Sequence, residues 1–231
     1  MMRCIRLHIM CKLCGAAAGG IFMKNRTSNK TQYLTVLAIF IAIVAVVQLF
    51  FGSISINSVS FSVVLIPIVV GGAILGPTAG AVLGFTFGLI TLINGLCSRD
   101  VFTAFLLFNT GVKGTIVTSL VCIAKATLAG WGAALIYNAL KGKNQYLAVI
   151  LAAGAAPVIN TGIFVLAMIF VLADEFAKTM QNFGITGVSV VNYVILGLSG
   201  VNFIVEFLVN VVLSPAIYAL IKAVSKGRLK A

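Results

Sequence analysis

The stretch that decides the fold is residues 65–89, LIPIVVGGAILGPTAGAVLGFTFGL, which contains no charged residue. Apolar runs of this kind are typical of transmembrane helices, which need about 20 such residues each. Gly76-Pro77 divides the stretch, and proline commonly begins a helix because it lacks a backbone N–H. The sequence therefore predicts a tight helical hairpin between one membrane helix at about 59–75 and another at about 78–93.

Glycines recur at every fourth position around this hairpin. Residues four apart share one face of a helix, and glycine lets two helix backbones approach closely inside a membrane. We expect internal packing of the second and third helices, and the alternative is a smooth face that slides against a partner. The glycines are Gly72, Gly76, Gly80, Gly84 and Gly88.

The whole composition agrees with a membrane protein. Of the 231 residues, 61% are hydrophobic and 9% are charged, whereas a soluble domain has about 45–50% and 25%. The mean hydropathy is +1.17. The length suits about six membrane helices, and it leaves no room for a nucleotide-binding domain.

Further apolar segments complete an all-α bundle of six transmembrane helices. The apolar run 101–108 is too short to span and is predicted to be interfacial or re-entrant, and residues 174–189 are predicted to form a polar loop. The other four predicted spans are residues 33–51, 116–140, 146–173 and 190–223.

The charge distribution orients this bundle. Sixteen Lys and Arg oppose four Asp and Glu, for a net charge of +12. Six of the bases lie in residues 1–30, two in the 141–145 turn and four after residue 221. Six spans place these segments on one face, so the positive-inside rule puts both termini in the cytoplasm. We expect a multi-pass protein of a bacterial plasma membrane, in contact with membrane lipid and with no nucleic-acid partner.

The N-terminal segment is predicted to be separate from the membrane domain. Residues 1–30 read as a basic cytoplasmic tail and residues 31–231 as the domain, with Met23 as a natural start and residues 1–22 as a start-site extension. The Cys11–Cys14 pair has no second pair, and a structural metal needs about four ligands. We therefore predict no metal and no cofactor.

Polar residues inside the spans form the candidate site. Lys125 and Glu206 are ionisable groups within apolar helices, which are functional candidates by default. Asn202, Glu206 and Asn210 share a helix face, and Asn160 follows Pro157. One interpretation is structural, with a buried Lys125–Glu206 pair. The other is a polar pocket, open to the outside, for a small ligand. The candidate substrate-binding residues are Lys125, Asn160, Asn202, Glu206, Asn94, Arg99 and Gln48.

Familiar enzyme motifs are missing from the sequence. It contains no GxxxxGK[ST], HExxH or GxSxG pattern, and its one histidine is His8. We therefore do not expect an enzyme.

The hairpin resembles that of the substrate-binding subunits, or S components, of energy-coupling factor (ECF) transporters. Its most specific part is the GPxxGA pattern at 76–81, and the six-span layout, the size and the AxxxA pattern of Ala38 and Ala42 agree over residues 33–222. The resemblance implies a protein that binds a vitamin or similar micronutrient from outside. It also implies a transmembrane coupling subunit (EcfT-like) and two cytoplasmic ATPases as partners. Ala38 and Ala42 would contact the coupling subunit, and Ala45 would extend that surface.

The segments 124–130, 160–161 and 202–206 look most like a branch of this family often assigned to pantothenate. That branch has arginine where Lys125 stands. The resemblance implies that Lys125 neutralises a carboxylate and that Asn160, Asn202 and Glu206 bind amide and hydroxyl groups.

Asn94 and Arg99, with the 52–58 loop, would cover the entrance. S components for folate, riboflavin or another micronutrient remain alternatives. A non-transporting membrane scaffold and a secondary transporter are the alternatives from other classes.

Overall fold

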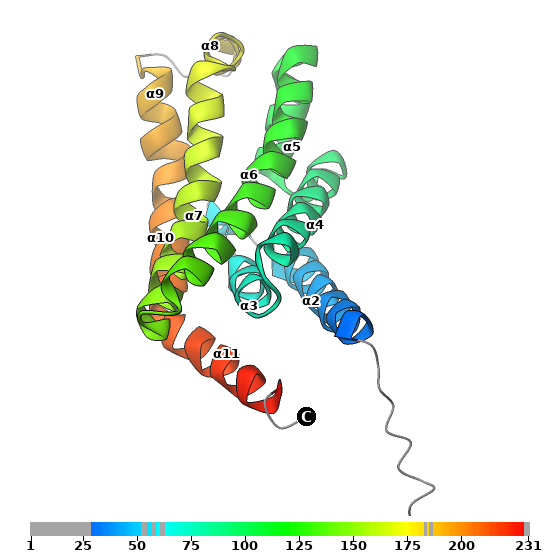
Figure 1. Cartoon of the computed structure of the whole chain (residues 1–231). Coiled ribbons are helices and arrows are strands. Elements are labelled where there is room, and N and C mark those ends of the chain that lie inside the picture. Colours follow the sequence, from blue (N-terminus) through cyan, green and yellow to red (C-terminus); the bar gives the residue numbers. More distant parts are fainter. Residues whose placement is uncertain are drawn as a thin grey trace, which may run out of the picture. The chain divides into compact units, whose positions relative to one another are not determined.

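The computed structural model describes residues 29–51, 55–56, 59–60, 63–182, 184 and 187–228 (Figure 1). The predicted basic tail falls almost wholly outside these residues, as do Cys11, Cys14 and His8. The chain divides into two compact units, Met1–Thr35 and Val36–Ala231. The described part of the first unit is helical, and in it the Thr35 hydroxyl donates to the Thr31 carbonyl at 2.9 Å. The remaining description concerns the second unit.

The described chain is mainly helical, as the sequence predicts, and it also contains one short β-hairpin that was not predicted. The hairpin pairs β1 and β2 antiparallel, with Ser55 opposite Ser60. In order, the elements are α2 (Asn29–Phe51), β1 (Ser55–Ile56), β2 (Val59–Ser60), α3 (Leu65–Leu75), α4 (Pro77–Leu96), α5 (Val101–Asn109), α6 (Gly111–Leu140), α7 (Gln145–Phe170), α8 (Ala173–Asn182), α9 (Val190–Asn192), the π-helix η1 (Tyr193–Gly200), α10 (Val201–Val212) and α11 (Ser214–Arg228).

Four of the described helices are long and apolar enough to cross a membrane. α10 and α11 would make a fifth span if counted together, although they meet at a bend of 46°. α3 has 11 residues, which is about 16 Å of helix against a hydrocarbon core of about 30 Å. The described part therefore has four or five candidate spans. The four are Lys30–Phe50, Pro77–Leu96, Gly111–Leu140 and Gln145–Phe170.

The predicted break at Gly76-Pro77 is confirmed. Gly76 has φ 102°, a conformation that side chains with a Cβ rarely adopt, and Pro77 is the first residue of α4. The predicted helix start at residue 59 is wrong, because Val59 and Ser60 are in β2 and the helix begins at Leu65. The cause is visible in residues 58–62, where serine at every second position gives the period of a strand.

Three other boundaries differ from the predictions. α6 begins at Gly111 rather than at 116. The predicted polar loop 174–189 contains α8, in which Phe176 and Met180 are buried. The last predicted helix is broken at Leu213, because Pro215 has no N–H to continue the hydrogen-bond ladder. The short segment 101–108 lies in a separate helix of nine residues, α5, and its predicted interfacial or re-entrant location stays a prediction.

The glycine pattern packs internally, as predicted, but chiefly against α6. A Cβ added to Gly88 would lie 2.5 Å from the carbonyl oxygen of Cys122, and one added to Gly84 would collide with the Ala126 carbonyl. Gly80 meets Gly130 in the same way. The α4–α6 crossing is therefore a direct backbone contact, and these glycines are not a free sliding face.

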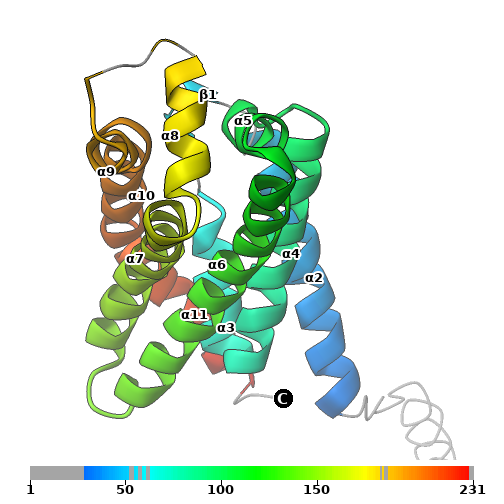
Figure 2. The same ribbon diagram turned by 90° about the horizontal axis from the view of Figure 1, so that it is seen from above.

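Buried apolar side chains form two clusters. The first cluster is built from α2, α3, α4, α6, α7 and α11, and it reaches the turn between α6 and α7. The second cluster lies toward the opposite end, with α5, α8 and η1 (Figure 2). Its buried members are Leu106, Phe164, Met168, Leu172, Phe176, Met180 and Val194.

Candidate functional site

Polar residues separate the two clusters along each of three helical segments. On α7, Ala156 belongs to the first cluster and Phe164 to the second, and Asn160 lies between them. Lys125 lies between the clusters on α6 in the same way. The third segment comprises η1, α10 and the start of α11, and it runs from Val194 in the second cluster to Ile217 in the first. We define the polar band as Lys125, Asn160, Ser199, Asn202 and Glu206.

Packing brings Asn160 and Asn202 to the same level. A Cβ added to Gly154 of α7 would lie 3.2 Å from the Phe207 ring of α10. The two helices run in opposite directions. A position about one and a half turns after Gly154 on α7 therefore lies at the level of a position about one and a half turns before Phe207 on α10. Those positions are Asn160 and, to within a residue, Asn202. Asn160 and Asn202 therefore lie at a similar depth on two adjacent helices.

The band contains buried polar atoms that the protein does not satisfy. Asn160 is 7% exposed, and its Oδ1 has no hydrogen-bond partner among the described residues. The same holds within that part of the chain for Asn202 Oδ1 and Ser199 Oγ. An unsatisfied buried polar group costs about 1–3 kcal/mol, and such groups are rare in folded proteins. Three such atoms lie at the level between the two apolar clusters.

Lys125 contributes a cation at the level of this band. Its Nζ lies 5.1 Å from the centroid of the Phe164 ring, and Phe164 is one turn from Asn160 on α7. A cation over an aromatic face is stabilised without a counter-charge. The alternative, an ion pair of Lys125 with Glu206, stays a prediction. Glu206 is 3% exposed, and its backbone carbonyl accepts a hydrogen bond of 2.8 Å from Asn210 Nδ2.

Gln48 and Asn94 belong to a second polar group, on α2 and α4. Gln48 Nε2 donates to Thr91 Oγ1 at 3.1 Å, and Thr91 donates in turn to the Phe87 carbonyl at 3.0 Å. Asn94 follows on α4 and is 2% exposed, and its Nδ2 has no partner among the described residues.

Arg99 stands apart from both groups. It is exposed between α4 and α5, where its backbone N–H donates to the Asn94 carbonyl at 2.8 Å. Of the 52–58 loop, only Ser55 and Ile56 are among the described residues. The predicted cover of the entrance therefore stays a prediction.

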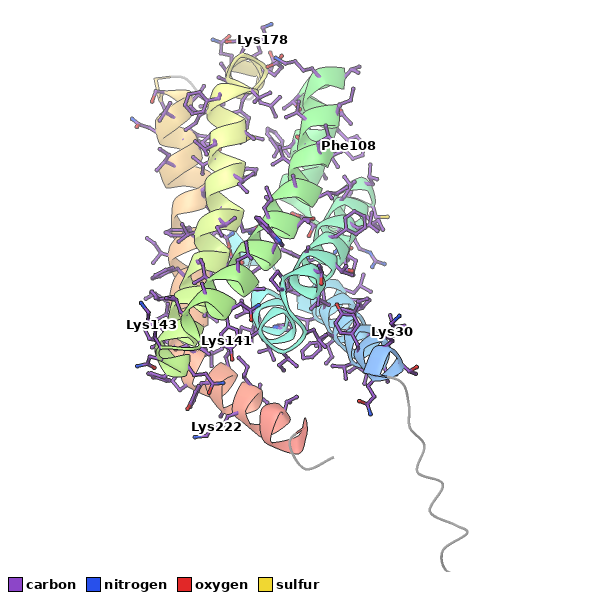
Figure 3. The ribbon with its side chains drawn as sticks, viewed as in Figure 1. Lys30, Phe108, Lys141, Lys143, Lys178 and Lys222 are labelled. Atoms are coloured by element: carbon purple, nitrogen blue, oxygen red, sulfur yellow. The ribbon has the colours of Figure 1, made fainter. Side chains whose placement is uncertain are left out.

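An ion pair ties two elements at the end opposite to the 141–145 turn. Lys113 Nζ of α6 lies 2.9 Å from Glu175 Oε1 of α8. This hydrogen-bonded ammonium holds the pKa of the Glu175 carboxyl below its ordinary value. Figure 3 places Lys178 at this same end and Lys141, Lys143 and Lys222 at the other.

Sequence reasoning missed two buried hydroxyls, Ser199 and Thr118. Both lack a hydrogen-bond partner among the described residues. Most helical hydroxyls donate to their own helix, as Thr127 does to the Ile123 carbonyl at 2.7 Å. Because the sequence does not distinguish the two situations, no signal pointed to Ser199 or Thr118. Among the described residues, no group of three or more His, Cys, Asp or Glu side chains could hold a metal ion.

The predicted partner surface lies on α2. Ala38 and Ala42 are exposed and Ala45 is half-buried, whereas Val44 between them is fully buried. Small exposed residues one turn apart leave room for the close approach of another helix.

One family model matches residues 32–218, that of the ECF transporter, substrate-specific component. A comparison with curated proteins gives no match. The family match covers most of the chain and nearly the same residues as the resemblance in the sequence. It decides against a non-transporting scaffold and against a secondary transporter, and the family is not one of enzymes. The chain therefore belongs to the substrate-specific components of ECF transporters, multi-pass membrane proteins that bind the substrate and associate with the coupling subunit and the ATPases.

Proposed function

We propose that this S component captures a small, anionic, water-soluble vitamin from outside the cell, with pantothenate favoured over folate, riboflavin or another micronutrient. One observation carries the proposal: Lys125 lies over Phe164, one turn from Asn160, whose buried Oδ1 has no hydrogen-bond partner in the described part of the chain. A cation beside unpaired amide oxygens suits a ligand that has both an anionic end and hydrogen-bond donors.

Lys125 is assigned to the carboxylate of the vitamin. The Phe164 ring stabilises the ammonium but leaves its donors available. Lysine offers a point charge instead of the planar fork of arginine. A single carboxylate oxygen, rather than a bidentate pair, is the contact we expect.

The amides are assigned to the polar body of the ligand. Asn160 Oδ1 and Asn202 Oδ1 are acceptors, so they call for N–H or O–H donors on the substrate. Pantothenate carries an amide N–H and two hydroxyl groups, which match acceptors of this kind. Glu206 is assigned to the same layer as a further hydrogen-bond partner, and Ser199 joins it as a donor or an acceptor.

Asn94, Arg99, Gln48 and the 52–58 loop are assigned to the entrance. Support comes from the exposed position of Arg99 at the end of α4 and from the buried Nδ2 of Asn94. An exposed arginine near the opening attracts an anion before it reaches Lys125.

The proposed topology has six crossings with both termini in the cytoplasm. α3 is too short alone, so residues before Leu65 would complete its crossing, and η1 with α10 would form the last. Thiol labelling tests the orientation. Cys97 is exposed after α4 and should react from outside, whereas Gly142→Cys in the basic turn should react only after permeabilisation. Labelling of both from outside would contradict the topology.

Ala38, Ala42 and Ala45 are assigned to the contact with the coupling subunit. Their exposure on α2 supports this role. The ATPases supply energy through that subunit.

The experiment that tests the substrate is mass spectrometry of small molecules that co-purify with the protein from rich medium, followed by binding measurements with pantothenate, folate and riboflavin. Stoichiometric pantothenate is the expected result. Another vitamin would remove pantothenate and the carboxylate role of Lys125. If Lys125→Ala and Asn202→Ala bind every vitamin as the wild type does, the assigned site is wrong.

A further inference from the structure

A concave surface lies outside the polar band, along the outer face of α7. It is a groove of about 590 Å³ between α6, α7 and α10. Gly154 and Ala155 of α7 form its floor, Ile136 of α6 one wall, and Phe207 and Val211 of α10 the other. All nine lining residues are apolar.

This groove faces the surroundings of the bundle. Leu151 and Val158, which lie on the same stretch of α7, are 45% and 47% exposed. Since α7 is a candidate membrane span, the groove opens to the hydrocarbon region. Its lining offers no hydrogen-bond partner to a vitamin, and it therefore differs from the polar band.

One end of the groove is marked as a membrane interface by aromatic and basic residues. Tyr146 is one turn before Ile150 on α7, and its ring packs edge-on against Tyr218 of α11 at 5.4 Å between centroids. Tyrosines of this kind gather at membrane–water interfaces. Lys222 lies over the Tyr218 ring, with Nζ 5.5 Å from its centroid.

The charge at this end has a single sign. Lys141 and Lys143 are exposed in the turn between α6 and α7, and Figure 3 shows them at the same end as Lys222. The four acids of the chain lie elsewhere: Asp100, Asp174 and Glu175 in the segments that follow α4 and α7, and Glu206 within α10. Lysines at the interface attract anionic headgroups, and their side chains extend along apolar surface to reach them.

We propose that this groove is a binding site for an anionic phospholipid. One acyl chain lies on the Gly154–Ala155 floor between Ile136 and Phe207. The phosphate lies at the basic end, with Lys141 and Lys143. From Ile150 to Val158 the groove runs along about 12 Å of helix, which suits the first part of an acyl chain. The site is separate from the vitamin site and does not depend on the identity of the vitamin.

The test is native mass spectrometry of the full chain after delipidation, titrated with phosphatidylglycerol and with phosphatidylcholine of the same acyl chains. The wild type is expected to bind phosphatidylglycerol more tightly. Each interfacial lysine contributes about fivefold, so Lys141→Gln with Lys143→Gln should weaken phosphatidylglycerol binding about 25-fold and leave phosphatidylcholine binding unchanged. Lys178→Gln, at the opposite end, is the matched control and should change neither.

The acyl chain is tested by filling the floor. Ala155→Leu should reduce binding of both lipids, and Gly162→Leu should reduce neither. Gly162 is seven residues further on the same face of α7, beyond the groove, with open space for a side chain. Thermal unfolding midpoints confirm that each variant is folded.

Three results would overturn the proposal. They are equal affinity of the wild type for the two lipids, unchanged lipid binding by Ala155→Leu, and a dimer of this chain that Ala155→Leu abolishes. The last result would assign the groove to a second copy.

Discussion

Asn160→Leu tests whether the Asn160 side chain binds the substrate or stabilises the folded protein. Leucine has the same branching and the same number of side-chain heavy atoms as asparagine, so the substitution removes the amide without opening a cavity. Asn160 Oδ1 has no protein partner among the described residues, so no described hydrogen bond of that atom is lost in the ligand-free protein. We therefore expect the unfolding temperature of the ligand-free protein to stay the same or to rise.

The effect on binding should be large. A substrate donor that loses its acceptor in a buried site costs about 1–3 kcal/mol, which is about 5- to 150-fold in Kd. The assay is equilibrium dialysis of the purified protein with pantothenate first and then with the other vitamins, together with thermal unfolding in the same detergent.

The control is Thr127→Val on α6, whose hydroxyl donates to its own helix at 2.7 Å. It should leave vitamin binding unchanged. A fall of more than about 5 °C in the unfolding temperature of Asn160→Leu, which is more than about 1 kcal/mol for a chain of this size, would refute the reasoning, because the amide would then be a structural contact. An unchanged Kd would remove Asn160 from the site.

Four further changes test other parts of the structure. Lys125→Ala should weaken binding of an anionic vitamin strongly, and Lys125→Arg should restore most of it, as dialysis at low and high salt would report. Gly84→Leu should lower the unfolding temperature by several degrees, because its side chain would enter the Ala126 backbone and overpacking costs about 1–3 kcal/mol. Ala42→Leu should leave vitamin binding unchanged and reduce co-purification of the coupling subunit. The pKa of Glu175 is lowered in the folded protein, so its pairing with Lys113 stabilises above the ordinary carboxyl pKa and is lost as pH falls through the lowered value. The difference in unfolding temperature between wild type and Lys113→Ala should therefore be constant from pH 7 to about pH 5 and vanish at lower pH.

The controls for these changes are at a position with open space for a side chain and at a lysine far from Glu175. Gly142→Leu has open space for its side chain and should leave the unfolding temperature nearly unchanged, unlike Gly84→Leu. Lys143→Ala, at the opposite end of the bundle, should leave the pH dependence of stability as it is in the wild type. Equal destabilisation by the two glycine variants, or a Lys113 effect that persists at low pH, would contradict the assigned contacts.

The sequence predicts the hairpin and the long helices well because their causes are local. Gly76-Pro77 determines the turn through backbone conformation alone, and long apolar runs determine α4, α6 and α7. One error falls where a tertiary contact decides. α8 is polar in composition and is a helix because Phe176 and Met180 reach the second cluster.

The site was predictable in part for a similar reason. Asn160 and Asn202 are conspicuous as amides in apolar helices, and packing places them at one level. The position of the Lys125 ammonium group depends on its contact with Phe164, and no sequence pattern identifies this apolar residue as its partner. Whether a hydroxyl such as that of Ser199 bonds to its own helix depends on local geometry, here within the π-helix η1.

The backbone contact of α4 with α6 has a consequence for motion. Where glycine Cα atoms meet carbonyl groups, no side chain can change rotamer to absorb a displacement, and weak Cα–H···O bonds add to the attachment. We expect the amides around Gly84 to be among the slowest in the chain to exchange with deuterium. We expect the conformational change that admits and releases a substrate to involve α7, η1, α10 and the connections between them.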